Sequence, residues 1–359
     1  MGFIASTFLQ HLRRPERACW HIKRSRAASP PKMAPVRLRS TVPRPSPRAR
    51  KALEADDHVV PPAAPPPATH HTATLLVQCA DRTGVVAAIG QLLFGLGANI
   101  IECDQFTDQS ACRYFQRVRL DYSNILVGAG NVRPMLEQAM RELVRRYPDM
   151  QWRVAYDSDR RRVGVLVSKM DHCLYDLLLR VRSGELPADV PVVISNHDDL
   201  RPVASMFGVD FHFVDAHKLG AEETERRIEE LLFDKYAVDT VALARYMQIL
   251  SRRYCERHAH RTINIHHSFL PAFEGGRPYH RAHERGVKLI GATAHYVTVE
   301  LDSGPIIEQQ VARITHRDSV ENMIRKGRDL ERLTLARAVR WHVEDRVLVH
   351  GNKTVVFDD

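Results

Sequence analysis

The stretch 263–273, INIHHSFLPAF, carries polar side chains suited to chemistry on a carbonyl group. The run TINI predicts a strand on which Asn264 and His266 occupy alternate positions, so both side chains leave the same face. Asp302 follows His266 by 36 positions and supplies a carboxylate from a later loop, LDSGPII. An amide donor can stabilise a developing oxyanion, and an imidazole backed by a carboxylate can move a proton. These three residues are predicted to act together in acyl chemistry.

The chain that follows His266 is predicted to leave regular structure. Glycines and prolines are dense just after it, at Pro271, Gly275, Gly276 and Pro278. Such residues turn the backbone into a loop, where a scaffold usually displays its reactive groups.

Length and composition indicate two folded domains with an additional segment. The chain has 359 residues, of which 44% are hydrophobic, enough for sizeable cores. No stretch approaches the 18 or so apolar residues of a membrane span, so we expect no membrane partner. The six cysteines are scattered without CxxC spacing and are expected to be buried or incidental thiols of a reducing compartment.

The basic character of the chain is concentrated at its N-terminus. Residues 1–53 hold 13 Lys or Arg and one acid, a net charge of +12 against +9 for the whole chain, so the remainder carries about −3. The folded body therefore offers no general case for binding nucleic acid. The leader has the composition of an organellar transit peptide, which predicts a mitochondrial location. The alternative is a disordered tail, or an untranslated extension before Met33, of a cytoplasmic protein.

A proline-rich linker and a first folded unit follow the leader. Residues 54–71 include VVPPAAPPPA, which is typical of a semi-rigid polyproline spacer. The unit at 72–157 has the predicted order β-α-β-β-α-β of a ferredoxin-like fold. Its expected strands are 72–79, 98–106, 112–122 and 151–155, and its expected helices are 85–96 and 133–147.

The second unit, 160–359, alternates buried strands with helices, which predicts a doubly wound, mostly parallel sheet. Its expected strands are 162–168, 190–196, 209–214, 238–244 and 262–265, and its expected helices are 172–182, 200–207, 222–233, a helix containing MQIL (247–250) and 321–343. Strands at 291–300 and 306–314 are expected to return antiparallel, and 352–357 to form an edge strand. Ligands of such sheets bind beyond the carboxyl ends of the strands.

The first unit resembles the ACT family of regulatory domains in the segment LLVQCADRTGVVAAIGQLLFGLGANIIECDQFTD. The glycine of DRTG, Gly84, stands where that family needs the backbone to approach a ligand. The resemblance implies an amino-acid effector such as glycine or methionine, and assembly of the chain into a homo-oligomer. The alternative is that the unit only mediates dimerisation.

The second unit resembles the folate-dependent formyltransferase family over about 200 residues. The matching motifs are N-I-H-x-S-x-L-P with Asn264 and His266, D-x-G-x-I with Asp302, and GATAHYV with His295. The resemblance implies 10-formyltetrahydrofolate as a small-molecule substrate and no tightly bound cofactor.

Within that family, the chain is similar to the deformylase branch, which hydrolyses 10-formyltetrahydrofolate to formate and tetrahydrofolate and supplies formate for purine synthesis. The ACT-like unit precedes the catalytic one, and His267 replaces a proline that the glycinamide ribonucleotide transformylases have. The glycine-rich phosphate turn of those transferases is replaced by SKMDHCL, and SNHDDLRP lacks an expected lysine. Without a cradle for an amine substrate, water is the expected nucleophile.

The resemblance also implies the site residues. Catalytic roles fall on Asn264, His266, Asp302 and His295, substrate contacts fall on Met247, Gln248, Ile249, Leu250, Val297 and His267, and no residue is expected to hold a metal. Asn264 is expected to donate to the formyl oxygen, with His266 beside it as cation or proton carrier. Asp302 is expected to position or deprotonate the water and His295 to hold the network. Asp171 and His172 also follow a strand end and are candidates to line the pocket.

Three other functions compete with this interpretation. A metal-dependent hydrolase could use His266, His267, His295 and Asp302 as ligands, although adjacent histidines on a strand point to opposite sides. A formyltransferase to an amine such as glycinamide ribonucleotide, or to a tRNA, needs an acceptor site. A sensor without catalysis would use only the first unit.

Overall fold

The computed structural model describes residues 71–125, 131–271 and 278–358. The predicted leader and residues 54–70 of the predicted linker lie outside these ranges, as do Gly275 and Gly276. Within the described ranges, no helix has the length and apolar character needed to cross a membrane. The five cysteines there are all free thiols.

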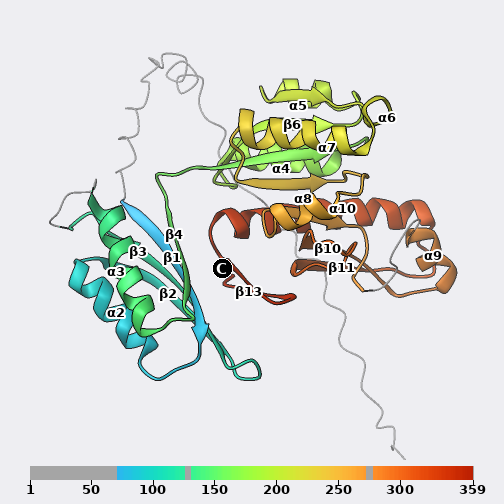
Figure 1. Ribbon diagram of the computed structural model, residues 1–359. Coiled ribbons are helices and arrows are strands. Elements are labelled where there is room, and N and C mark those ends of the chain that lie inside the picture. The colour runs from blue at the N-terminus through green and yellow to red at the C-terminus, as the bar shows by residue number, and fades with distance from the viewer. Residues whose placement is uncertain (1–70, 126–130, 272–277, 359) are drawn as a thin grey trace, which may run out of the picture. The chain divides into compact units, whose positions relative to one another are not determined.

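Residues 72–156 form a four-stranded antiparallel sheet with two helices, drawn in blue to green in Figure 1. The elements are β1 (Thr72–Ala80), α2 (Val85–Leu96), β2 (Asn99–Asp108), β3 (Arg113–Asp121), α3 (Val132–Arg146) and β4 (Gln151–Tyr156). The strand order is β2-β3-β1-β4, and α2 and α3 share one hydrophobic core with the sheet. Left-handed glycines bound α2, with Gly84 at φ 91° before it and Gly97 at φ 78° after it. The predicted β-α-β-β-α-β order is confirmed.

The second part of the chain is built on a seven-stranded sheet with the order β11-β10-β9-β8-β5-β6-β7. The strands are β5 (Arg161–Val167), β6 (Ala188–Ser195), β7 (Asp210–Phe213), β8 (Thr240–Ala244), β9 (Thr262–His266), β10 (Leu289–Tyr296) and β11 (Ile306–Arg313). All neighbours from β7 through to β9 pair in parallel, whereas β9–β10 and β10–β11 are antiparallel. The prediction of a mostly parallel α/β sheet with two antiparallel strands is confirmed.

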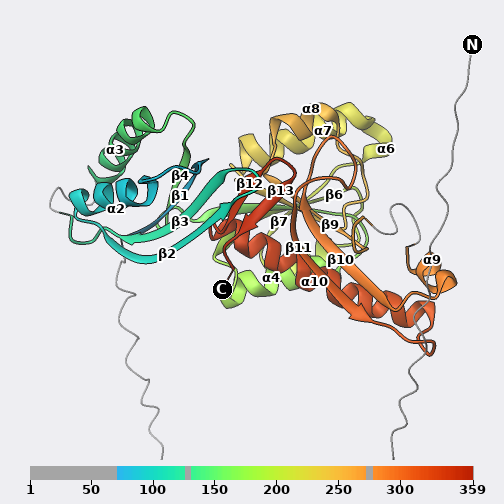
Figure 2. The ribbon, with the colours of Figure 1, turned by 90° about the horizontal axis from the view of Figure 1, so that it is seen from below.

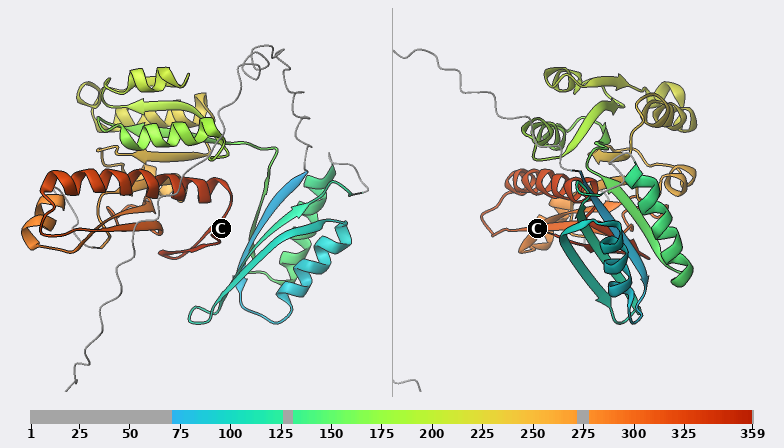
Figure 3. Two further views of the ribbon diagram at one scale, coloured as in Figure 1. Left: turned by 180° about the vertical axis from the view of Figure 1, so that it is seen from behind. Right: turned by 90° about the vertical axis from the view of Figure 1, so that its left-hand side faces the viewer.

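Helices cover both faces of this sheet, as the views in Figures 2 and 3 show. They are α4 (His172–Ser183), α5 (Arg201–Met206), α6 (Ala216–Leu219), α7 (Ala221–Glu229), the π-helical turn η2 (Glu230–Lys235), α8 (Arg252–Arg257), α9 (Pro278–Arg285) and α10 (Val320–Val343). Successive residues of β5 serve opposite cores: Val165 packs with α4 and α10, and Leu166 packs with α7 and η2. Gly164 lets η2 approach the sheet, because a Cβ there would lie 2.4 Å from the Leu232 side chain.

The order in which the chain adds strands to the sheet reverses between β5 and β8. From β5 it proceeds outward to β6 and β7, then returns to form β8 on the other side of β5. Ligands of open α/β sheets bind at such a switch point, outside the carboxyl ends of the strands. The loops after β5 and β8 meet there, since the Met247 amide donates to Ser168 Oγ at 3.2 Å.

Four details of the predicted elements were wrong. Residues 247–250 form no helix, because Arg245 at φ 65° ends the strand geometry and α8 begins only after the Ser251 cap. Strand β10 ends at Tyr296 instead of 300. Pro278, expected to lie in a loop, begins α9, where a proline needs no hydrogen-bond partner. The C-terminal strand β13 (Lys353–Val356) pairs only with β12 (Val347–His350) in a hairpin and is no edge strand of the large sheet.

Candidate active site

Strands β9 and β10 present the central polar residues side by side. Asn264 pairs directly with His295 in the antiparallel register, and His266 pairs with Thr293. Side chains at directly opposed positions lie on the same face. Asn264 Nδ2 is 3.3 Å from His295 Nε2. The sheet ladder itself therefore fixes the spacing of these groups.

Asp302 reaches the same place from the turn between β10 and β11. One of its carboxylate oxygens lies 3.1 Å from His266 Nδ1 and the other 3.7 Å from His295 Nε2. The backbone of Asp302 has φ 54°, and a Cβ on nearby Gly304 would lie 1.8 Å from the Tyr296 carbonyl oxygen. Glycine at position 304 is thus required for the turn to fold back onto β10 and deliver the carboxylate.

Hydrogen bonding fixes the tautomer of His295. Its Nδ1 lies 3.0 Å from the Tyr296 carbonyl oxygen, which can only accept, so Nδ1 carries the proton. In neutral His295, Nε2 then accepts from the Asn264 amide. This contact orients the amide nitrogen of Asn264 and leaves its second N–H available to an oxygen of a ligand.

The charge of Asp302 is stabilised by its partners. Burial would raise the pKa of this carboxyl, but the contact with His266 outweighs burial and holds the pKa of Asp302 well below its ordinary value. With Nδ1 facing this anion, His266 has its Nε2 buried without a hydrogen-bond partner among the described residues. His266 is only 4% exposed, so an unsatisfied ring nitrogen there is costly unless a ligand or water supplies the partner.

These groups line a cavity of about 540 Å³. Two loops with apolar side chains form its walls, one at 246–250 and the other at 297–301. Met247 is 60% exposed, Ile249 80% and Leu301 66%. Exposed apolar side chains facing a cavity suit a flat aromatic ring, with a few polar groups to set its orientation. Gln248, Leu250, Val297 and His267 line the same cavity.

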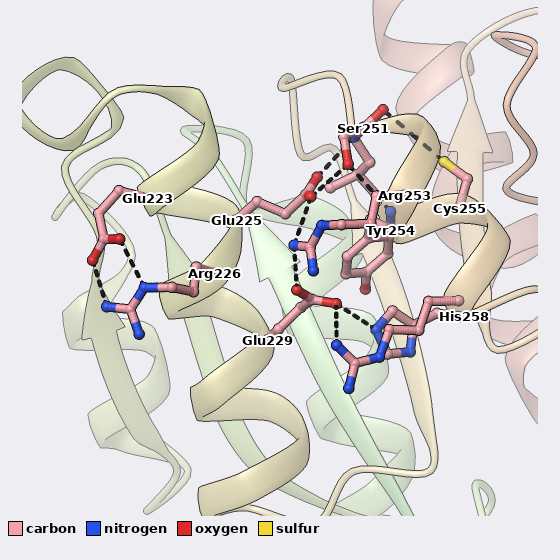
Figure 4. A network of polar contacts seen from close by, with 11 residues as sticks. Glu223, Glu225, Arg226, Glu229, Ser251, Arg253, Tyr254, Cys255 and His258 are labelled. Carbon is pink, nitrogen blue, oxygen red and sulfur yellow. Dashed lines mark hydrogen bonds and ion pairs between the residues drawn. The ribbon is translucent and has the colours of Figure 1, made fainter.

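A network of charged residues anchors the loop at 246–250 (Figure 4). Glu225 of α7 accepts from both the backbone amide of Ser251 at 2.7 Å and its hydroxyl at 2.5 Å. Arg253 of α8 bridges Glu225 at 3.2 Å and Glu229 at 2.6 Å. The loop is thereby held at one end by Ser168 and at the other by α7. Nothing in the local sequence singled out these residues, since glutamates and arginines on short helices usually form solvated faces.

His267 lies beside His266, and the pKa of its imidazole is lowered. Its ring centre is 4.9 Å from that of His266. Burial, together with the charge of Arg245, lowers the pKa of His267 to about 4. The His267 imidazole is therefore neutral at physiological pH and can act as a hydrogen-bonding group but not as a cation.

His172 and Asp171, which were candidates to line the pocket, are not among the residues around this cavity. His172 instead contacts Glu331 of α10, with Nε2 at 2.7 Å from a carboxylate oxygen. Asp171 precedes α4 and makes no side-chain capping bond to it.

Among the described residues, the group of possible metal ligands whose donor atoms lie close together includes none of His266, His267, His295 and Asp302. That cluster is His172, Cys173 and Glu331, within 4.8 Å of one another. Burial raises the pKa of the Cys173 thiol well above its usual value, and the Arg245 guanidinium lies 3.5 Å from Glu331. A protonated thiol and a neighbouring cation fit a hydrogen-bonded network better than a metal ion.

Three residues of the cavity region were missed by the sequence analysis, namely Arg245, Tyr279 and Glu331. Arg245 and Tyr279 line the cavity, and Glu331 contacts both of them from behind. His280 is exposed and also borders the cavity. The only signal in the sequence was a charged residue on the apolar side of the pattern of α10.

The fold and the sequence matches define a class of enzyme. Residues 161–339 match the formyl transferase family. Among solved structures, a glycinamide ribonucleotide transformylase from Symbiobacterium toebii aligns with a TM-score of 0.54 and 32% identity, covering 56% of this chain and 97% of that one.

Longer matches identify the branch of that class. A formyltetrahydrofolate deformylase of Synechocystis sp. is 50% identical over 288 residues, which are 80% of this chain and 98% of the relative. One from Bacillus subtilis is 48% identical over 285 residues, 79% of this chain and 93% of the relative. A crystal structure of a formyltetrahydrofolate deformylase from Pseudomonas syringae pv. tomato aligns with a TM-score of 0.76 at 41% identity, covering 87% of this chain and 98% of that one. The chain belongs to the formyltetrahydrofolate deformylase family.

Proposed function

We propose that this enzyme hydrolyses 10-formyltetrahydrofolate to formate and tetrahydrofolate. The observation that carries the proposal is the contact between His266 and Asp302 beside Asn264, in one cavity with apolar walls. The pterin ring lies between the loops at 246–250 and 297–301. The formyl group reaches Asn264 and His266. The proposed hydrolysis requires no bound cofactor.

The residues divide the chemistry among them. Water attacks the formyl carbon, its oxygen forms the new C–O bond, and the carbonyl oxygen becomes an oxyanion that accepts from the Asn264 amide. His266 supports the negative charge, transfers a proton to N10 as the C–N bond breaks and is reprotonated by the attacking water, while Asp302 stabilises the imidazolium and positions the water. His295 keeps Asn264 oriented through the contact of 3.3 Å. The products are formate and tetrahydrofolate, with the remaining proton released to solvent.

The decisive test omits any acceptor. The purified full chain is incubated with 10-formyltetrahydrofolate alone, and formate is measured. Formate released in step with tetrahydrofolate supports hydrolysis. Turnover that appears only when glycinamide ribonucleotide or another amine is added identifies a transferase and overturns the proposal.

The N-terminal sheet and its helices suit a regulatory role, as an ACT-like, ferredoxin-like domain that binds an amino acid and assembles the chain into a homo-oligomer. A cavity of about 610 Å³ lies at the start of α2 and includes Asp81, Gly84 and Gln105. The edge strand β2 exposes Ile100, Ile101 and Phe106, an apolar edge suited to a second copy. Calorimetry with glycine and methionine at millimolar concentration tests the effector, and sedimentation tests the assembly. Absence of heat with both amino acids would remove the effector from the proposal.

The basic leader supports delivery to mitochondria. It is rich in arginine and has one acidic residue in its first 53 positions. Fluorescent fusions of the full chain and of a chain beginning at Met33 test this. A full-length fusion that stays in the cytoplasm would contradict the assignment.

A further inference from the structure

The cavity has a second polar end, beyond the residues assigned to the chemistry. Arg245 and Tyr279 line it together with His267, next to His266. Arg245 follows the last residue of β8 in a left-handed backbone conformation, φ 65°, which few residues other than glycine adopt. Strained backbone of this kind is commonly found at ligand sites.

A buried carboxylate supports this end from behind. Glu331, in the middle of α10, is 2% exposed. One of its oxygens lies 2.7 Å from His172 Nε2, and the other accepts from the Tyr279 hydroxyl at 3.0 Å. Burial would raise the pKa of Glu331, but the hydrogen bond from His172 and the charge of Arg245 lower it, so the group is an anion.

The packing around Glu331 is closely fitted. Tyr279 reaches the carboxylate over Gly327, one turn earlier on α10, where an added Cβ would lie 1.9 Å from the Tyr279 hydroxyl oxygen. No side chain is compatible with this position unless Tyr279 moves. The helix is therefore shaped to admit the tyrosine and the bond that it makes.

Arg245 is held by this anion, yet its hydrogen-bonding capacity is largely unused. Within the described ranges its polar partner is Glu331, at 3.5 Å from Nε, and that nitrogen is buried without a hydrogen bond. The oxygens of Glu331 are already engaged by His172 and Tyr279. The terminal amino groups of Arg245 thus remain as donors in the wall of the cavity.

The proposed reaction creates a ligand that matches these donors. Hydrolysis converts a neutral formyl group into formate, a planar carboxylate, in a cavity that also holds the anionic Asp302. A guanidinium binds a carboxylate through two parallel N–H···O bonds, and few other side chains can do so. Because His267 is neutral, Arg245 is the cation at this end, and His267 can add a hydrogen bond.

We propose that Arg245, fixed by Glu331 and flanked by His267 and Tyr279, forms a subsite that binds formate as it leaves the formyl carbon. The inference rests on the proposed hydrolysis and assigns a product-binding role to a residue that takes no part in the bond changes. The positive charge of Arg245 offsets the repulsion that the anionic Asp302 exerts on the product.

The test measures formate binding without turnover. Sodium formate is titrated into the full chain by calorimetry, with sodium chloride as the ionic-strength control, and formate is also tested as a product inhibitor. In Arg245→Gln, formate affinity is expected to fall about 10-fold or more, because a hydrogen-bonded charge partner is lost. Arg245→Lys keeps the charge but not the planar pair of donors, and is expected to lose about 3-fold to 10-fold.

Arg332→Gln is the matched control, since Arg332 lies beside Glu331 on α10 but is 42% exposed and pairs with Asp329. Its formate affinity should equal that of the unaltered chain. Circular dichroism establishes folding, and if Arg245→Gln does not fold, Arg245→Lys decides the question. The subsite is overturned if folded Arg245 variants bind formate as tightly as the unaltered chain does. It is also overturned if the unaltered chain does not bind formate at a concentration 50-fold above that used for the substrate. Failure of the unaltered chain to release formate from 10-formyltetrahydrofolate instead overturns the proposed hydrolysis.

Discussion

His266 Nδ1 lies 3.1 Å from the Asp302 carboxylate, although the two residues are 36 positions apart in the chain. One residue is at the end of β9 and the other is in the turn after β10. The contact joins a rigid strand to a turn whose shape depends on Gly304. Separate mutations can therefore test the charge of Asp302, the position of Asp302 and the groups on β9.

Removing the charge of Asp302 should impair catalysis with little change in shape. Asp302→Asn leaves a side chain of equal size but deprives His266 of its counter-ion. Turnover is expected to fall by about 10²–10³, as for other preorganised electrostatic groups. Steady-state kinetics of formate release measure this. Asp318→Asn, in an ion pair with Lys326 and not among the residues that line the cavity, is the control and should retain full activity. Near-normal turnover of Asp302→Asn would remove Asp302 from the mechanism.

Asn264 should act mainly in the transition state. Asn264→Ala removes the donor to the oxyanion, so kcat is expected to fall by about 10²–10³ while KM changes little. The measurement is the separate determination of kcat and KM. A rise in KM at unchanged kcat would show that Asn264 binds the ground state only.

Displacing the turn should mimic the loss of Asp302. Gly304→Ala places a Cβ where the Tyr296 carbonyl oxygen already lies, so the turn must move away from β10. Activity is expected to fall at least 10-fold even though Asp302 is intact, with destabilisation of about 1–3 kcal/mol. Gly90→Ala is the control, because space is open around Gly90 in α2. Full activity of Gly304→Ala would contradict the role of the close approach.

Loosening the anchored loop should weaken folate binding. Glu225→Gln removes the charge that holds Ser251 and Arg253. The apolar loop at 246–250 then loses its fixed end, so KM for the substrate is expected to rise about 5-fold to 20-fold with kcat within about 3-fold. Kinetics over a range of substrate concentrations separate the two. Glu223→Gln, in an exposed pair with Arg226, should leave both constants unchanged.

Acid should destabilise the enzyme through buried neutral histidines. Burial lowers the pKa of His342 to about 3 and that of His267 to about 4, from 6.5. Between pH 6.5 and these values the unfolded chain binds more protons than the folded one, so the free energy of unfolding decreases as the pH falls through that window. His342, whose ring nitrogens face the Tyr296 and Thr240 hydroxyls, should account for roughly 1–2 kcal/mol by pH 5. Denaturant unfolding at pH 7 and pH 5 should show a smaller difference in His342→Gln, and an undiminished difference would refute this.

The sequence predicted those features that follow from local periodicity. Alternation in TINI placed Asn264 and His266 on one face, and strand and helix runs predicted the mixed sheet. The chemistry of the residue types suggested Asp302 as their partner, and the motif resemblance supported that choice, because no local pattern states which distant turn meets a strand end. The loop at 246–250 was mistaken for a helix, since Met, Ile and Leu are good helix or core residues when nothing shows that they face a cavity.

The roles of Glu331 and Arg245 were not predicted from the sequence, for a related reason. Glu331 falls on the apolar side of the α10 pattern, but that pattern does not say which partners the carboxylate meets. Only the fold reveals that α10 turns this position toward Tyr279 and His172. Glu225 was missed in the same way, because its partner Ser251 lies 26 residues further along the chain.

The pairing of β9 with β10 also bears on how such an enzyme can change over evolutionary time. Asn264 faces His295, and His266 faces Thr293, in a repeat of two residues. Inserting or deleting one residue in either strand, unless a β-bulge absorbed it, would turn the following side chains to the other face and separate these groups. Length variation among descendants must therefore accumulate in the connecting segments, and natural insertions there, far from the ladder, are the places to seek altered folate preference.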